Sequence, residues 1–121
     1  MDLTEQIYIN KKDRGMRKFD EILDFIHKNY NDSNMSLAIL ADSFNMNYQY
    51  ISKLFIAKTG TYFVNYLNVF RLEKSRELLD TTDLLVEEIA HRVGFTSGNS
   101  YIRTFKKYYR ITPGQYKKNS K

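Results

Sequence analysis

The chain has 121 residues, of which 42% are hydrophobic, so it is long enough for one domain or for two small units that share an interface. It contains no cysteine, which excludes disulfides and thiolate metal sites. Its formal net charge of +5 favours a polyanionic partner.

The excess of positive charge lies in the second half of the chain. Residues 1–60 contain eight acids and eight bases, whereas residues 61–121 contain six acids and eleven bases. From Tyr101 onward there is no acid, and there are seven bases: Arg103, Lys106, Lys107, Arg110, Lys117, Lys118 and Lys121. Such a run indicates nucleic-acid binding only if it lies on one face of a folded element.

The chain lacks the residue patterns of an enzyme or a membrane protein. Its two histidines, His27 and His91, are far apart, and we find no metal-ligand cluster, no nucleophile with a base, and no glycine-rich phosphate loop. We therefore expect no catalysis, no metal and no cofactor. The N-terminal MDLTEQ is acidic where a signal peptide is basic, and no apolar run reaches the ~18 residues that cross a bilayer. A cytoplasmic location without membrane contact is expected.

Repeated i, i+3, i+4 apolar spacing, with one proline and five glycines, predicts an all-α fold of seven helices. The charge-mixed residues 1–16 are predicted to be a linker or the remnant of a preceding domain. The predicted helices run over 17–30, from a Ser36 cap to 44, from an Asn47 cap to 60, over 62–79 after a Thr61 cap, over 85–93, from a Ser97 cap to 109, and from Pro113 after a Thr112 cap. This arrangement gives two units, 17–60 and 81–118, a long linker helix within 61–80, and a tail at 119–121.

The second and third predicted helices repeat weakly in the fifth and sixth. The matched positions are Leu40-Ala41 with Ile89-Ala90, Phe44 with Val93, Asn45 with Gly94, Asn47 with Ser97, Ile51 with Tyr101, Lys53 with Arg103, and Phe55 with Phe105. In each copy an alanine lies four residues before a turn residue, Asn45 or Gly94. Both of these turn residues accept a left-handed backbone. The repeat therefore predicts two helix-turn-helix units.

The outward faces of the two second helices carry an amide followed by a base. At 100° per residue, Gln49 and Lys53 point away from the apolar side of one helix, as do Asn99, Arg103 and Lys106 on the other. Amide side chains can pair with the adenine edge and basic side chains with guanine, so both faces suit reading of the major groove. A linker helix of roughly 27 Å would place the units about one DNA turn apart, ~34 Å, on an asymmetric site.

These motifs resemble the DNA-binding domain of the AraC/XylS family of bacterial transcription regulators. The resemblance covers residues 17–118 and is carried by SLAILADSF with ISKLF and KTG, NYLNVFRLEKSRELL, T-D-L-x-V-x-E-I-A at 82–90, VGF at 93–95, RTFKKYY at 103–109 and T-P-x-x-Y at 112–116. It implies two homeodomain-like helix-turn-helix units joined by a long helix, with reading helices in successive major grooves. It also implies recruitment of RNA polymerase, usually as an activator.

The resemblance assigns the site residue by residue. The base-reading positions of the first unit are Tyr48, Gln49, Ser52 and Lys53, and those of the second are Gly98, Asn99, Ser100, Ile102 and Arg103. The positions assigned to phosphate contacts are Ser36, Lys106, Lys107 and Arg110. Three residues depart from the family pattern. Arg110 replaces a common glycine, Leu85 stands where a serine or proline often begins the helix, and Gly98 offers no side chain for reading.

Other readings remain open. A helical module that binds an acidic protein through its basic face predicts an exposed apolar groove, whereas the aromatic residues here lie on inward-facing stripes. Family members commonly carry a sensing, dimerisation or receiver domain, and no part of this sequence resembles one. Two interpretations of the chain therefore remain: a fragment whose linker is residues 1–16, or a minimal regulator.

Overall fold

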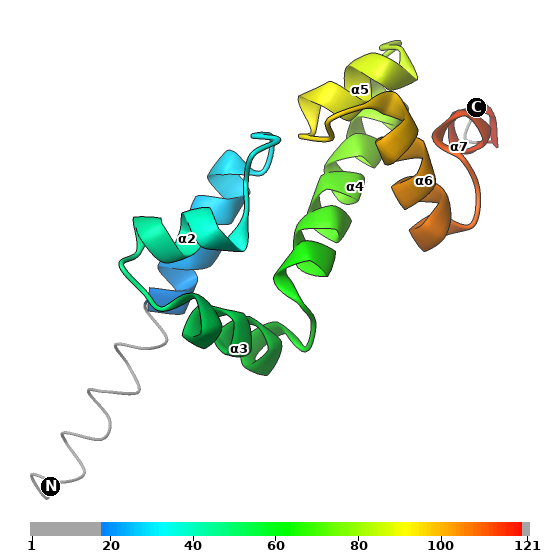
Figure 1. Cartoon of the computed structure of the whole chain (residues 1–121). Coiled ribbons are helices and arrows are strands. Elements are labelled where there is room, and N and C mark those ends of the chain that lie inside the picture. Colours follow the sequence, from blue (N-terminus) through cyan, green and yellow to red (C-terminus); the bar gives the residue numbers. More distant parts are fainter. Residues whose placement is uncertain (1–17, 120–121) are drawn as a thin grey trace, which may run out of the picture.

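The computed structural model describes residues 18–119, which form seven helices and no strand (Figure 1). A first helix spans residues 18–29. It is followed by α2 (Leu37–Ser43), α3 (Tyr48–Thr59), α4 (Phe63–Thr81), α5 (Val86–Arg92), α6 (Gly98–Tyr109) and α7 (Pro113–Asn119). The predicted all-α class with seven helices is confirmed. The predicted linker at 1–16 lies outside the described residues.

The helix caps follow the sequence signals at four starts. The side-chain oxygens of Ser36, Asn47, Ser97 and Thr112 each accept a hydrogen bond from a backbone N–H in the first turn of α2, α3, α6 and α7, at 2.9 to 3.2 Å. Each bond satisfies one of the donors that a helix start leaves unpaired. These caps fix where α3 and α6, the two helices predicted to read DNA, begin.

The predicted limits of α4, 62 and 79, and of the tail differ from the structure, in which α4 spans Phe63–Thr81. Thr61 does not cap α4, because that helix begins at Phe63 after Tyr62, and the Thr61 N–H donates instead to Thr59 Oγ1 at 3.3 Å. Asn119 belongs to α7 and not to the tail, as expected when a helix frays over one or two residues. At the start of α5, Glu88 Oε1 accepts from the Leu85 N–H at 3.2 Å, which compensates for the missing serine cap.

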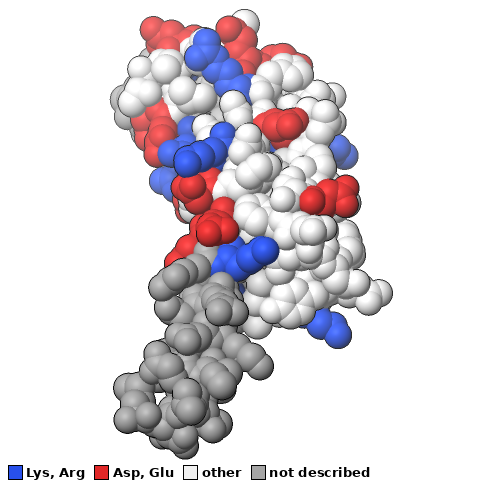
Figure 2. All heavy atoms as spheres, turned by 90° about the vertical axis from the view of Figure 1, so that its left-hand side faces the viewer, with Lys and Arg blue, Asp and Glu red and all other residues white. Residues whose placement is uncertain are grey.

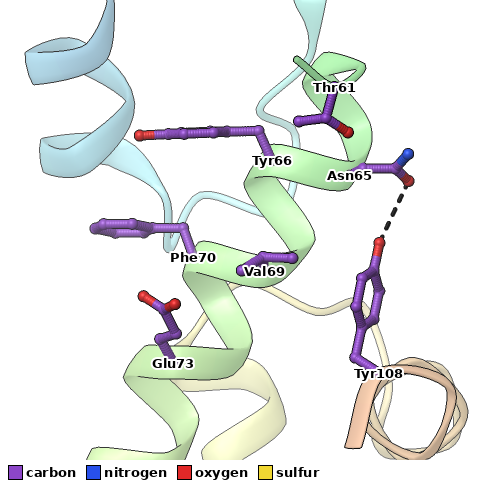
Figure 3. A pocket seen from close by; sticks show the side chains of 7 residues that line it. All are labelled: Thr61, Asn65, Tyr66, Val69, Phe70, Glu73 and Tyr108. Atoms are coloured by element: carbon purple, nitrogen blue, oxygen red, sulfur yellow. Dashed lines mark hydrogen bonds between the residues drawn. The ribbon is translucent and has the colours of Figure 1, made fainter. Parts of the chain in front are cut away.

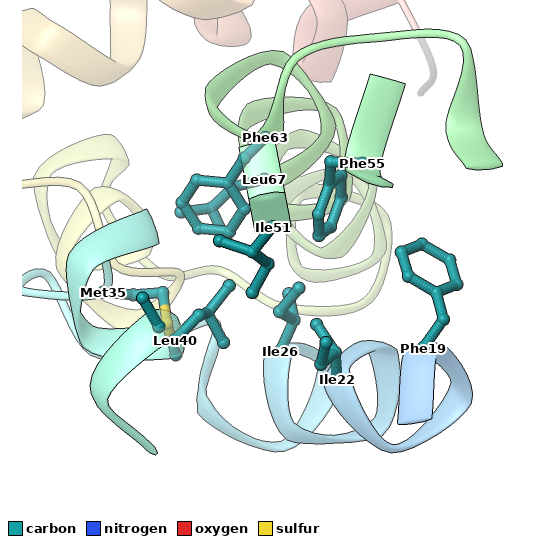
Figure 4. Close-up of a cluster of buried hydrophobic side chains, with 10 residues drawn as sticks. Phe19, Ile22, Ile26, Met35, Leu40, Ile51, Phe55, Phe63 and Leu67 are labelled. Carbon is teal, nitrogen blue, oxygen red and sulfur yellow. The ribbon is translucent and has the colours of Figure 1, made fainter. Parts of the chain in front are cut away.

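Helix α4 contributes to two separate hydrophobic cores. Its first half places Phe63 and Leu67 in a core with the first helix, α2 and α3, drawn in Figure 4. Its second half places Leu72 and Leu79 in a core with α5 and α6, whose largest fully buried side chains are Tyr101 and Phe105. Each helix-turn-helix unit thus completes its core with one half of α4.

Left-handed backbone occurs at equivalent places in the two units. Asn45 (φ 55°) and Gly94 (φ 102°) turn the chain between the paired helices, as predicted. Gly60 (φ 78°) ends α3, and Arg110 (φ 70°) ends α6 by donating its N–H to Lys106 O. A side chain at positive φ costs about 1–2 kcal/mol relative to glycine, so Arg110 adopts this conformation at an energetic cost.

We expect Arg110→Gly to stabilise the fold by about 1 kcal/mol, because it relieves the left-handed strain at the end of α6. Urea unfolding followed by circular dichroism measures this change. Arg110→Asn is the matched control, since asparagine tolerates the same conformation better than arginine, and its gain should be smaller. No gain with glycine would mean that the arginine side chain offsets its own strain.

The hydroxyl of Tyr101 is enclosed in the second core and has no hydrogen-bond partner among the described residues. Burial raises the pKa of Tyr101 to about 12, although the nearby Ser75 hydroxyl opposes part of this shift. The unfolded chain then releases this proton near its ordinary pKa of 10.0, well before the folded protein does. Stability therefore falls as the pH rises from the unfolded towards the folded pKa.

We expect Tyr101→Phe to change the free energy of unfolding by less than about 1 kcal/mol at neutral pH, because it removes a hydroxyl without a partner. At a pH of about 11, midway between the unfolded and the folded pKa, the variant should gain roughly 1 kcal/mol of stability on the parent. Urea midpoints at both pH values measure the difference. The exposed Tyr48→Phe is the control, and equal pH profiles for all three proteins would refute the effect of burial.

Candidate nucleic-acid interface

The first unit presents its predicted reading residues on the free side of α3. Tyr48 is 54% exposed, Gln49 and Lys53 are exposed, and Ser52 is half-buried. The opposite side of the helix places Ile51 and Phe55 in the first core with no exposed surface. The helix therefore separates an apolar anchoring side from a polar outer side, as its sequence spacing predicts.

A hollow of about 410 Å³ lies beside these residues, between α2, α3 and the first half of α4. Ser36, Tyr48 and Ser52 line it from one side, and Val64 and Asn68 of α4 line it from the other. Its polar atoms are hydroxyls and amides, apart from the guanidinium of Arg71 at its base. The Ser36 oxygen already accepts the α2 capping bond, which leaves its hydroxyl proton for another acceptor. Sequence reasoning did not find the contribution of α4 to this surface.

The second unit presents a more basic face on α6. Asn99 and Arg103 are exposed, while Ser100 and Ile102 are half-buried. Further along the same helix and at its end, the three predicted phosphate-binding residues are all exposed: Lys106, Lys107 and Arg110. Nothing in the described residues gives these three side chains an ion-pair partner within 4 Å, so their charge is directed to solvent.

Gly98 differs from the other predicted reading positions of the second unit because it is buried. A Cβ added there would overlap the Glu87 carboxylate of α5. The Glu87 carboxylate is the end of an exposed side chain that can move, so the reading role of Gly98 stays a prediction. The sequence could not show this packing, because a glycine in a first helical turn is equally compatible with contact to a ligand.

The two units differ in charge. Residues 18–60 carry four bases and five acids, whereas residues 82–119 carry seven bases and three acids. Figure 2 shows the molecule from the side of the first helix, where uncharged side chains cover a broad area and the charged groups of both signs are scattered. The positive charge is therefore a property of the second unit and not of the whole surface.

A second hollow, of about 420 Å³, lies on the other side of α4 (Figure 3). Three aromatic side chains line it, Tyr66 and Phe70 of α4 and Tyr108 of α6, and the Tyr108 hydroxyl donates to Asn65 Oδ1 at 3.3 Å. Helical spacing places this hollow opposite the one beside Tyr48. This hollow is similar to the exposed apolar groove that is expected if the domain is a protein-interaction module.

The part of the chain from 18 to 119 contains no group of three His, Asp or Glu side chains placed to hold a metal ion. Within the same range, no helix is both long and apolar enough to span a membrane.

Comparison with known proteins identifies the family. A family model described as a helix-turn-helix domain matches residues 40–119, more than half of the chain. The chain belongs to the AraC/XylS family. It is an AraC-type DNA-binding domain of a transcription regulator, and not an enzyme.

Two relatives and one more distant structure illustrate this membership. The AraC-type chain is 36% identical over 111 residues to the HTH-type transcriptional regulator YijO of Escherichia coli, covering 91% of this chain but only 38% of YijO. It is 41% identical to the C-terminal domain of the two-component response regulator YesN from Fusobacterium nucleatum, with a TM-score of 0.79 over 81% of this chain and 95% of that one. The DNA-binding domain of AdpA, solved with a target DNA, is 23% identical with a TM-score of 0.79 over 83% and 89% of the two chains, and shares the fold.

Proposed function

We propose that this AraC-type domain binds an asymmetric site in double-stranded DNA, with the N-terminal halves of α3 and α6 in successive major grooves. The observation that carries the proposal is the duplicated unit with an exposed amide and an exposed base at equivalent positions, Gln49 with Lys53 and Asn99 with Arg103. Because the two units are tandem copies on one chain, each half-site has its own sequence. Residues 17–118 would then form the complete binding module.

The roles of the contacting residues follow from their chemistry. Gln49 and Asn99 suit the adenine edge, Lys53 and Arg103 suit guanine, and Tyr48 and Ile102 offer apolar contact to a thymine methyl group. Ser52 and Ser100 supply hydroxyls to either base. Lys106, Lys107 and Arg110, together with the hydroxyl of Ser36, would bind phosphates and hold the register.

Binding to such a site would allow the domain to regulate transcription. By its family, the domain would act on promoter DNA in the bacterial cytoplasm and recruit RNA polymerase, most simply as an activator. A partner protein on the aromatic hollow of Figure 3 would not compete with DNA, because that hollow lies across α4 from the reading residues. A sensing or dimerisation domain would have to be supplied outside residues 17–118.

Selection of bound duplexes from a random pool tests the proposal. We expect an enriched asymmetric sequence with two conserved blocks whose centres lie about one helical turn apart. Equal binding to every duplex would refute base reading. A partner that is captured equally well after nuclease treatment, with no enriched duplex, would favour the protein-interaction module instead.

A further inference from the structure

The centre of α4 carries a buried arginine where the apolar stripe of the helix would place another hydrophobic residue. Arg71 follows Phe63 and Leu67 at intervals of four and precedes Leu72, and it is only 7% exposed. Leu67 belongs to the first core and Leu72 to the second. Arg71 therefore lies at the point where α4 passes from one unit to the other.

The guanidinium of Arg71 binds the turn that follows the first helix. Its Nε donates to Tyr30 O at 2.8 Å, and its Nη2 donates to Asp32 O at 2.8 Å. Burial lowers the pKa of Arg71, and only the nearby Asp32 charge opposes this effect. A planar guanidinium with two donors in fixed directions defines the orientation of both carbonyls, which a lysine ammonium with freely rotating donors does not.

The same group also contacts the turn of the second unit. The Arg71 guanidinium carbon lies 5.8 Å from the centre of the Phe95 ring. At Gly94, a Cβ atom would come within 2.7 Å of Arg71 Nε and within 2.5 Å of Tyr30 O, so only a glycine admits this approach. Arg71 is thus packed between the turn that follows the first helix of one unit and the helix-turn-helix turn of the other.

A small change of angle at this junction would displace the two reading helices by several ångströms. Helix α4 is about 28 Å long, so its ends lie about 14 Å from its midpoint. A rotation of about 14° at the midpoint moves a group at that distance by about 3.4 Å, the rise of one base pair along a strand. A small change of angle at Arg71 therefore corresponds to a whole step in the register of one unit on DNA.

We propose that Arg71 is a positioning residue that fixes the angle between the two reading helices and so determines which spacing of half-sites the domain accepts. The proposal rests on the two-groove binding mode proposed above. If Arg71 were merely structural, its replacement would lower stability and would lower the affinity for all duplexes equally. If Arg71 positions the helices, its replacement changes the discrimination between spacings.

The binding experiment compares the parent with Arg71→Lys on the selected site and on the same site with one base pair inserted or deleted between its halves. We expect the parent to lose about tenfold or more in affinity for the altered spacings, and Arg71→Lys to lose less than about threefold. Arg76→Lys is the matched control, because Arg76 lies on the same helix and its guanidinium stacks on two rings of the second unit, Tyr109 and Tyr116. Unchanged spacing discrimination in Arg71→Lys would overturn the proposal.

A second measurement needs no DNA and separates the two proposals. Because the chain has no cysteine, Lys58→Cys on α3 and Lys107→Cys on α6 accept one spin label each at exposed positions. Pulsed dipolar spectroscopy should give a broader or shifted distance distribution in Arg71→Lys than in the parent and in Arg76→Lys. If Arg71→Lys does not fold, Arg71→Gln takes its place. An unchanged distribution overturns the positioning role of Arg71. A parent without any spacing preference overturns the two-groove mode and with it the spacing role, whereas the helix angle measured by the labels is independent of DNA.

Discussion

Gly94→Ala is expected to destabilise the protein by about 2–5 kcal/mol. Roughly 1–2 kcal/mol arises from the left-handed backbone at φ 102°, which an L side chain rarely adopts. A further 1–3 kcal/mol or so arises from overpacking, because the added Cβ meets Tyr30 O and the Arg71 side chain. Urea unfolding followed by circular dichroism measures the total.

Gly60→Ala separates these two contributions. Gly60 has a similar backbone conformation at φ 78°, but a Cβ there would have no neighbour within 4 Å. We therefore expect only the backbone cost of about 1–2 kcal/mol in this variant. Equal losses at the two glycines would show that the contact of the Gly94 turn with Arg71 has no energetic weight.

Arg103→Ala is expected to weaken binding to the selected site by about 1–3 kcal/mol and to relax sequence preference at one position. The side chain is exposed in the free domain, so its loss should leave the fold intact, with a change in stability within about 0.5 kcal/mol. Because a bidentate contact to guanine distinguishes that base from the others, the loss should be confined to duplexes that carry the preferred base. Titrations on the selected duplex and on its single-position variants measure this.

Lys107→Ala is the matched comparison on the same helix. Lys107 is also exposed, but it lies two turns from the start of α6, where contact with the sugar-phosphate backbone is expected. Its removal should weaken binding to all duplexes alike and reduce the slope of log affinity against log salt by about 1. If both variants lose affinity uniformly, the assignment of Arg103 to base reading is wrong.

Local rules account for most of the fold. The four caps are short polar side chains that bond within three residues, and the left-handed turns at Asn45 and Gly94 use residue types that favour this backbone. Both features depend on neighbours in the sequence, so the sequence predicts them. The Thr61 error shows the limit, because a residue type that suits a cap lies one residue too early, and α4 begins at Phe63 without a side-chain cap.

The less predictable features depend on contacts between distant segments. The exposure of Gln49 and Arg103 follows from helical periodicity, whereas the burial of Gly98 depends on Glu87, which lies on another helix. Arg71 did carry a signal, since it is a charge on the apolar stripe that includes Phe63 and Leu67. That signal indicates a buried polar contact, but the acceptors, Tyr30 O and Asp32 O, are backbone atoms that no side-chain pattern reveals.

The division of α4 between two cores has a practical consequence for engineering. Chimeras that exchange reading units between relatives are naturally joined at the ends of the long helix, near residues 60 and 81. Such joints would pair Phe63 and Leu67, or Leu72 and Leu79, with a foreign set of core partners. A crossover within α4, next to Arg71, keeps each half of the helix with the unit that evolved around it, and so transfers a complete reading unit.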